Sequence, residues 1–87
     1  MEEVELKIDE NGTKIYYIKS TKIYHRDDGP AVENTNGNKY WLQYGKYHRL
    51  DGPAVECTNG YIQYWIYGKY IPNVNSIEEA IIKSLLE

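Results

Sequence analysis

Two His-Arg pairs, His25-Arg26 and His48-Arg49, are the residues of this chain best suited to chemistry. A guanidinium group presents a planar fork of donors, so that beside an imidazole it can hold a phosphate or a carboxylate through two hydrogen bonds. If the two segments stack on one another, both arginines fall in one row. The first interpretation is therefore that these pairs contact an anionic ligand.

The second interpretation is that the same arginines belong to the scaffold. A residue repeated identically in two units is often structural, and carboxylates stand nearby in both units: Asp28 and Asp51 in the turns, and Glu33 and Glu56 in the strands that follow. Each Asp-Gly-Pro sequence predicts a turn in which Asp accepts local backbone hydrogen bonds and Gly takes a positive φ. The two roles stay open and are compatible with each other.

Other chemistry has little support. A metal site built from His25, Asp28, His48 and Asp51 would rest on two histidines without a cysteine or a tight i,i+4 spacing, which is weak evidence. The sequence shows no Ser/His/Asp or Cys/His set, no glycine-rich phosphate loop and no distinctive pair of carboxylates. We therefore expect no enzyme activity and no cofactor, and the single Cys57 excludes an intrachain disulfide.

The pairs recur because the chain is a tandem repeat. Residues 25–33 return at residues 48–56, an offset of 23 positions (48 − 25), and the register continues through Thr-Asn-Gly and Tyr-Gly-Lys-Tyr blocks. Between those blocks, residues 38–43 and 61–66 differ at every position, so individual contacts would be specified there. A period this short indicates stacked units that bury one another's apolar faces.

The elements that would position the pairs are β-hairpins. Residues 4–9 alternate strictly and precede an Asn-Gly turn, and residues 13–18 return as a second strand. Sliding by 25 positions (39 − 14) pairs Tyr16 with Trp41, so residues 4–21 are a degenerate first repeat before the repeats at 22–47 and 48–70. One hairpin per repeat gives about six strands in an antiparallel meander.

The period changes near the carboxyl terminus. Ser76-Ile77-Glu78-Glu79 has the pattern of a capping box, and apolar residues then recur at helical spacing. We predict a helix over 76–87 that either caps an open end of the sheet or docks on a second copy. The fold class is therefore mainly β (α+β), a single domain over 1–87 with an antiparallel β-meander of hairpin repeats and one C-terminal helix.

Both faces of the predicted sheet carry aromatic residues. The chain has 10 Tyr, 2 Trp and no Phe, so its core and its contact surfaces use rings with a polar tip. Strand alternation places Tyr16, Trp41 and Tyr64 on one face and Tyr17, Leu42 and Trp65 on the other. One face can be covered by the helix, and the other then needs a partner, a second subunit or a planar ligand.

Charge and length limit the partners. A net charge of −3 argues against duplex nucleic acid and anionic membranes, although a small anion in a local basic pocket stays possible. No segment resembles a signal peptide or a membrane span, so we expect a soluble, non-secreted, cytoplasmic protein. A chain of 87 residues buries too little surface for high stability, which favours a homo-oligomer.

The segments Trp41-Leu42-Gln43-Tyr44-Gly45-Lys46-Tyr47-His48 and Tyr64-Trp65-Ile66-Tyr67-Gly68-Lys69-Tyr70 resemble the MORN repeat, a 23-residue hairpin unit with an aromatic residue, a Gly-Lys turn and a following His. The His-Arg-x-Asp-Gly-Pro-Ala variant is similar to repeats in small proteins of bacteriophages and large DNA viruses. It departs from the family where Arg26 and Arg49 replace the usual Gly after His. The resemblance covers residues 22–70 well and 4–21 weakly, and it implies a scaffold for binding.

The function we expect first is a phage-type anti-defence protein that sequesters a nucleotide-derived immune signalling molecule in the cytoplasm of the host. Tyr and Trp rings would stack on the base, and His, Arg or Lys side chains would meet the phosphates. The alternative is a protein–protein module that inhibits a host defence protein through its aromatic sheet face. The candidate ligand-binding residues are His25, Arg26, Trp41, Tyr44, Lys46, His48, Arg49, Trp65 and Tyr67.

Overall fold

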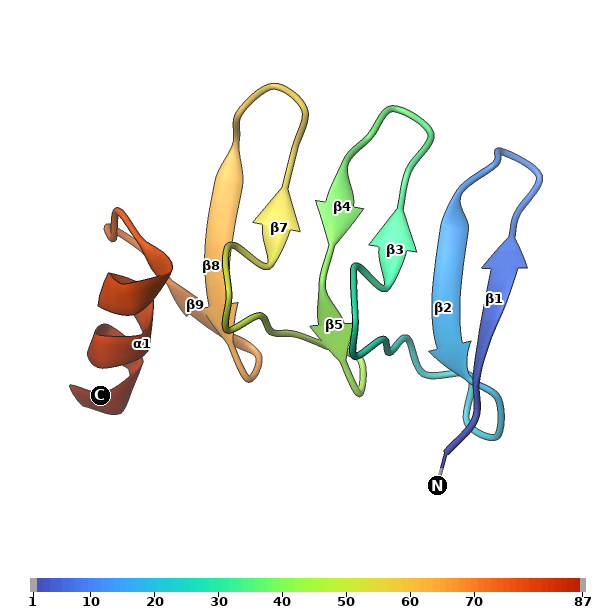
Figure 1. Cartoon of the computed structure of the whole chain (residues 1–87), viewed down its shortest axis with the longest axis horizontal. Coiled ribbons are helices and arrows are strands. Elements are labelled where there is room, and N and C mark those ends of the chain that lie inside the picture. Colours follow the sequence, from blue (N-terminus) through green and yellow to red (C-terminus); the bar gives the residue numbers. More distant parts are fainter. Residues whose placement is uncertain (1, 87) are drawn as a thin grey trace.

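An Asn-Gly sequence at residues 11–12 reverses the chain between its first two strands, and from residue 36 onward Asn-Gly and Tyr-Gly sequences alternate and do the same (Figure 1). A computed structural model describes residues 2–86, which form nine strands and one helix. The predicted Met1 start of the domain and the Glu87 end of the helix lie outside these residues. The elements are β1 Val4–Ile8, β2 Lys14–Ile18, β3 Val32–Glu33, β4 Lys39–Tyr40, β5 Leu42–Gln43, β6 Lys46–Tyr47, β7 Val55–Glu56, β8 Ile62–Ile66, β9 Lys69–Ile71 and α1 Ile77–Leu86.

Among the described residues, seven strands form one antiparallel sheet in the order β1-β2-β3-β4-β7-β8-β9, and β5 pairs with β6 in a small second sheet. The mainly β fold with a hairpin meander and one C-terminal helix is thus confirmed. Principal extents of 38 × 33 × 16 Å make the molecule a thin plate. No helix in residues 2–86 is long and apolar enough to cross a bilayer.

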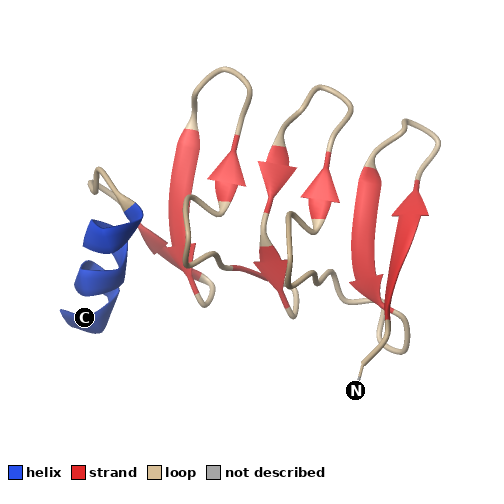
Figure 2. Ribbon diagram, viewed as in Figure 1, coloured by secondary structure: helices blue, strands red, loops and turns tan. Residues whose placement is uncertain are grey.

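The expectation of one hairpin per repeat, with about six strands, was incomplete. Each full repeat forms two hairpins: a longer one closed by an Asn-Gly loop, as in β3–β4, and a tight one closed by Tyr-Gly, as in β5–β6. The longer loops lie at one edge of the plate and the tight turns at the other (Figure 2). The tight hairpin forms because Tyr44 and Gly45 both have positive φ, as a two-residue type I′ turn requires.

Hydrogen bonds repeat with the sequence, and the first hairpin takes part in this repetition. The backbone N–H of Tyr16 donates to Ala31, and that of Trp41 donates to Ala54 in the same way. Arg26 lies over the Tyr16 ring and Arg49 over the Trp41 ring, which is the pairing predicted from the 25-residue offset. Tyr16 of the first hairpin therefore makes the same contacts as Trp41 of the next, although the surrounding sequences differ.

The helix caps the last hairpin. Ser76 Oγ accepts a hydrogen bond from the Glu79 N–H at 3.1 Å, as the capping box predicted. The Glu79 carboxylate reaches back one residue further than the motif predicts, and accepts from the Asn75 N–H at 3.0 Å. Ala80, fully buried, packs with Ile66 and Ile71 in the apolar core that α1 makes with β8 and β9. Of the two predicted roles, the structure shows the capping of the sheet end.

Candidate functional site

Each Arg-x-Asp-Gly-Pro segment is held by its own arginine. Arg26 Nε donates to Asp28 Oδ1 at 3.0 Å, and Arg26 Nη1 donates to the Pro30 carbonyl at 3.2 Å. Arg49 repeats both bonds, to Asp51 at 2.8 Å and to Pro53 at 3.0 Å. These are scaffold contacts of the kind that the second interpretation predicted, and contact with a ligand remains a prediction.

The glycines of these turns correct one expectation. Gly29 and Gly52 do not have the positive φ that the turn sequence suggested, and each is needed for space instead. A Cβ added at Gly29 would lie 2.8 Å from the Arg26 guanidinium carbon, and one at Gly52 would lie 2.9 Å from that of Arg49. The guanidinium therefore passes directly over the glycine, and Asp accepts from the arginine side chain rather than from the local backbone.

On its other side each guanidinium covers an aromatic ring. Arg26 Cζ lies 4.0 Å from the centre of the Tyr16 ring, and Arg49 Cζ lies 3.7 Å from that of Trp41. Such cation–π contacts are worth about 0.5–2 kcal/mol according to how much water they exclude. They fix the turn segments on the sheet face that carries Tyr16 and Trp41.

The histidines hold the tight turns. His25 Nδ1 accepts a hydrogen bond from the Tyr44 N–H at 3.0 Å, and His48 Nδ1 accepts one from the Tyr67 N–H at 2.8 Å. Their rings also meet, with centroids 4.3 Å apart in the first pair and 3.9 Å in the second. Because an accepting Nδ1 carries no proton, each imidazole is the neutral Nε2–H tautomer in this geometry.

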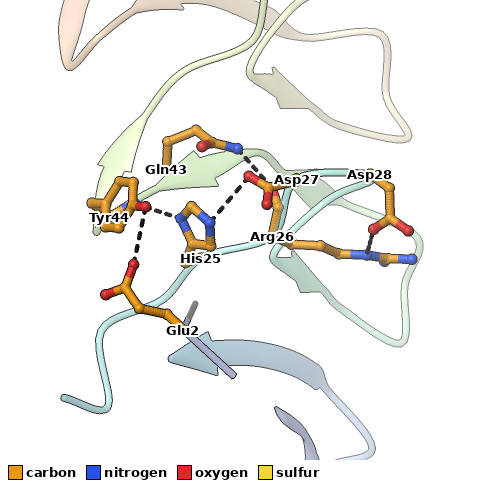
Figure 3. A network of polar contacts seen from close by, with 7 residues as sticks. All are labelled: Glu2, His25, Arg26, Asp27, Asp28, Gln43 and Tyr44. Carbon is orange, nitrogen blue, oxygen red and sulfur yellow. Dashed lines mark hydrogen bonds and ion pairs between the residues drawn. The ribbon is translucent and has the colours of Figure 1, made fainter. Parts of the chain in front are cut away.

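The two histidine sites differ in their surroundings, and Figure 3 shows the first of them, around His25. His25 is 4% exposed, and its Nε2 lies 3.1 Å from Asp27 Oδ1, whereas Leu50 replaces that aspartate in the next repeat. Burial lowers the pKa of His48. The Tyr44 hydroxyl donates to Glu2 at 3.1 Å, and this hydrogen bond to a carboxylate raises the pKa of Tyr44.

A hollow of about 660 Å³ lies between the two turn segments on the Arg-bearing face. Its lining includes two guanidinium groups and three carboxylates, a formal balance of −1 (2 − 3). The charged groups are Arg26 and Arg49 and Asp27, Asp28 and Asp51. An anion in this hollow would meet arginines that already bond to two of those carboxylates, so the hollow is a poor phosphate site as it stands.

The structure gathers part of the predicted site. Arg26, Trp41, His48, Arg49 and Tyr67 line the hollow together. His25 and Tyr44 pair with each other beside it. Lys46 lies at the edge of the tight turns, where its side chain packs against Gly68, and Trp65 lies on the opposite face of the sheet, as strand alternation predicted.

A row of aromatic rings on that opposite face was only partly anticipated. Tyr40 and Tyr47 have ring centroids 6.3 Å apart, Tyr47 and Trp65 are 5.1 Å apart, and Trp65 and Tyr70 are 5.3 Å apart. The register places Tyr17 opposite Tyr24 at the equivalent position of the first hairpin. We call this surface the aromatic face; its rings are Tyr17, Tyr24, Tyr40, Tyr47, Trp65 and Tyr70.

Sequence reasoning identified Tyr17 and Trp65 on this face but missed the others, although Tyr24, Tyr47 and Tyr70 recur at the repeat period. It also missed Gln43, whose Nε2 donates to the Arg26 carbonyl at 2.9 Å. Within residues 2–86, no three His, Cys, Asp or Glu side chains gather closely enough to hold a metal ion.

Comparison with known protein families, curated proteins and solved structures found no match.

Proposed function

We propose that this chain is a non-enzymatic binding protein that contacts a protein partner through its aromatic face. The observation that carries the proposal is the placement of the non-strand elements. The Arg-held turns pack over Tyr16 and Trp41, and α1 packs against Tyr64 and Ile66, all on the other face. The aromatic face is thus the side of the plate on which neither of these elements is packed.

The cross-strand registers show how unequal the two faces are. On the aromatic face, one row of cross-strand partners begins at Lys7 and is otherwise mainly apolar: Ile15, Val32, Tyr40, Val55 and Gln63. The adjacent row on the other face alternates in charge between its apolar ends, Ile8 and Ile62: Lys14, Glu33, Lys39 and Glu56. Since the charged face also carries the turns and the helix, the less polar face is the one left for a partner.

The shape of the aromatic face favours a protein over a small planar ligand. Its rings extend over all the hairpins from Tyr17 to Tyr70, while a nucleobase would cover one or two of them. From Tyr40 to Tyr70 the neighbouring rings are tilted by 32–56°, so this part forms a continuous surface and not a parallel slot. Tyr and Trp dominate the energetically important contacts of protein interfaces, because they bury a large area and keep one polar group.

The test is site-specific photocrosslinking in a lysate of the cells in which the protein acts. A photoreactive residue replaces Tyr70, which is 44% exposed on the aromatic face, or Leu85, which is 79% exposed on the helix, as the matched control. We expect one discrete adduct from position 70, lost when Trp65→Ala is added, and no such adduct from position 85. Identical adduct patterns from both positions would contradict the proposal.

A nucleotide-derived signalling molecule bound in the hollow, as part of a phage-type anti-defence function, is the second candidate. The supporting observation is that Arg26, Trp41 and Arg49 line one hollow with His48 and Tyr67. A phosphate there would have to displace the arginine–aspartate bonds or use the remaining guanidinium donors.

Native mass spectrometry with cyclic dinucleotides, cyclic oligonucleotides and ADP-ribose derivatives tests the second candidate. The matched variant is Asp27→Leu, which copies the residue found at position 50 and removes one carboxylate from the hollow. Stoichiometric binding that strengthens in this variant supports the hollow as the site. If no compound binds either form, this candidate is excluded.

A further inference from the structure

The sheet ends at β1, which has no neighbouring strand on its outer side within the described residues. Leu6 lies opposite Tyr16 in the register with β2. The Tyr16 N–H donates to Ala31 and its carbonyl accepts from His25, so both groups of Tyr16 point away from β1. In an antiparallel pair, opposite residues either exchange both bonds or neither, so the N–H and carbonyl of Leu6 point outward to the free edge.

The same holds at both ends of the strand. Val4 lies opposite Ile18, whose N–H donates to Ile23 and whose carbonyl accepts from Lys22, on the side away from β1. Because hydrogen-bonded and non-bonded pairs alternate along an antiparallel ladder, the N–H and carbonyl of Ile8 also point to the free edge. The side chains of Val4, Leu6 and Ile8 share one face of the sheet and are 37%, 47% and 58% exposed. An outward-bonding strand with a row of exposed apolar side chains is an edge that can accept another strand.

We propose that two copies of this chain pair their β1 strands antiparallel, about a two-fold axis through Leu6. In this register Leu6 meets Leu6 of the second copy, and Val4 meets Ile8 of the second copy, so the apolar rows join on one face. On the other face, Glu5 of each copy meets Lys7 of the other. Every outward N–H of these apolar residues gains a carbonyl acceptor, and each copy supplies one half of two opposite-charge pairs.

The sequence Val4-Glu5-Leu6-Lys7-Ile8 selects this register over its neighbours. An axis through Glu5 would place the two Glu5 carboxylates opposite each other, and an axis through Lys7 would do the same with two ammonium groups. A slip of one residue would bring apolar and charged side chains onto the same face. A lysine on an edge strand commonly prevents pairing, but here Glu5, two residues away, gives Lys7 an oppositely charged partner.

Two features oppose the pairing and limit its strength. The Glu5 carboxylate already accepts a hydrogen bond from the Tyr17 hydroxyl at 3.1 Å and lies 3.9 Å from Lys19 Nζ, so Lys7 of the second copy would share it with these groups. Just beyond the strand, Glu3 would lie opposite Asp9 of the second copy. The Asp9 carboxylate is drawn into its own turn, where Oδ1 accepts from the N–H groups of Asn11 and Thr13 at 2.9 and 3.0 Å. Because a single short strand pair buries less than the roughly 1,200 Å² of a stable interface, the dimer is weak and concentration-dependent.

Analytical ultracentrifugation of the full chain from about 10 μM to 1 mM tests the pairing by means of charge swaps. Lys7→Glu alone leaves two like-charge pairs, and so does Glu5→Lys, so each variant should dissociate at least about tenfold more readily than the parent chain. An equimolar mixture of the two variants restores both opposite-charge pairs and should return to dimers. The mixture is the decisive sample, because a merely structural role for either residue would not be rescued by the other chain.

Leu6→Pro is the second variant. The Leu6 N–H points to the free edge, so proline removes no hydrogen bond from the single chain but removes one donor per copy from the dimer. We expect a monomer at all concentrations with a melting temperature close to that of the parent measured when dilute. A parent chain that is monomeric up to about 1 mM, or a dimer unaffected by Lys7→Glu, overturns the proposal. The inference does not depend on the proposed function of the aromatic face.

Discussion

The two histidine contacts offer a matched test of how the tight turns are held. His25→Ala removes the acceptor of the Tyr44 N–H and a ring whose centroid lies 4.3 Å from that of Tyr44. A partly buried N–H left without a partner costs about 1–2 kcal/mol. The lost ring contact adds about 0.5–1.5 kcal/mol, which gives a total loss of about 2–3 kcal/mol in the free energy of unfolding.

His48→Ala should cost less. Its bond to the Tyr67 N–H is exposed, so water replaces the lost acceptor, and we expect about 1–2 kcal/mol from the weaker hydrogen bond together with the ring stack. The difference between the two variants, about 1 kcal/mol, is the predicted quantity, because both change the same residue type at equivalent positions of the repeat.

Urea unfolding followed by the fluorescence of Trp41 and Trp65 measures the loss in the free energy of unfolding of both variants. The samples are dilute enough for the chain to be monomeric. At a slope of about 1 kcal/mol per molar urea, the two midpoints should differ by about 1 M. His25→Asn is the control, since its side-chain oxygen can accept the Tyr44 N–H and should recover the hydrogen-bond part only. Equal losses at both positions, or a loss below about 0.5 kcal/mol at His25, would refute the role assigned to the imidazoles.

Three further outcomes are expected. Burial lowers the pKa of His48, so as the pH falls the unfolded chain binds a proton at this residue before the folded chain does. The stability that His48 contributes above its ordinary pKa of about 6.5 is therefore lost as the pH falls through the lowered pKa. Urea midpoints between pH 7 and 5 should fall less steeply in His48→Gln than in the parent chain. Gly29→Ala should lower the free energy of unfolding by about 1–2 kcal/mol, because the added methyl group pushes the Arg26 guanidinium off the Tyr16 ring. In a chain that already carries Arg26→Ala, the same change should lower it by no more than about 0.5 kcal/mol, which a double-mutant cycle of urea midpoints measures. Ser76→Ala should lower the free energy of unfolding by about 1 kcal/mol and reduce the helical circular dichroism signal, because the helix loses its amino-terminal cap. Ser84→Ala, within the same helix, is the control and should leave this cap intact.

The repeat architecture could be predicted because its signals are local. Asn-Gly and the alternation around it specify the longer hairpins, and the capping box at Ser76 specifies the start of α1. The tight hairpins were harder to recognise, because tyrosine is an unusual residue at positive φ and Tyr44 occupies that position. The imidazole that stabilises this turn comes from His25, 19 residues earlier, so the two residues cannot be connected without the register of the sheet.

The candidate site shows the same division between local and distant information. The bonds from Arg26 to Asp28 and Pro30 join residues at most four apart, and the proximity of arginine and aspartate in sequence already suggested them. The need for Gly29 arises from the path of the guanidinium over it and not from its own φ, which a turn pattern does not reveal. The ring row from Tyr40 to Tyr70 required the pairing of strands far apart in sequence.

Each unit contacts the unit before it in the same way, and this gives the chain an adjustable length. Thr35 packs its methyl group 2.8 Å from where a Cβ at Gly12 would stand, and Thr58 does the same at Gly37, 2.7 Å away. An additional 23-residue unit inserted after Tyr47 would find the same neighbours on both sides, without any change to the first hairpin or to α1. Duplication within the gene could therefore extend the aromatic face by a fixed increment, so that partners of different sizes could be matched by the number of units alone.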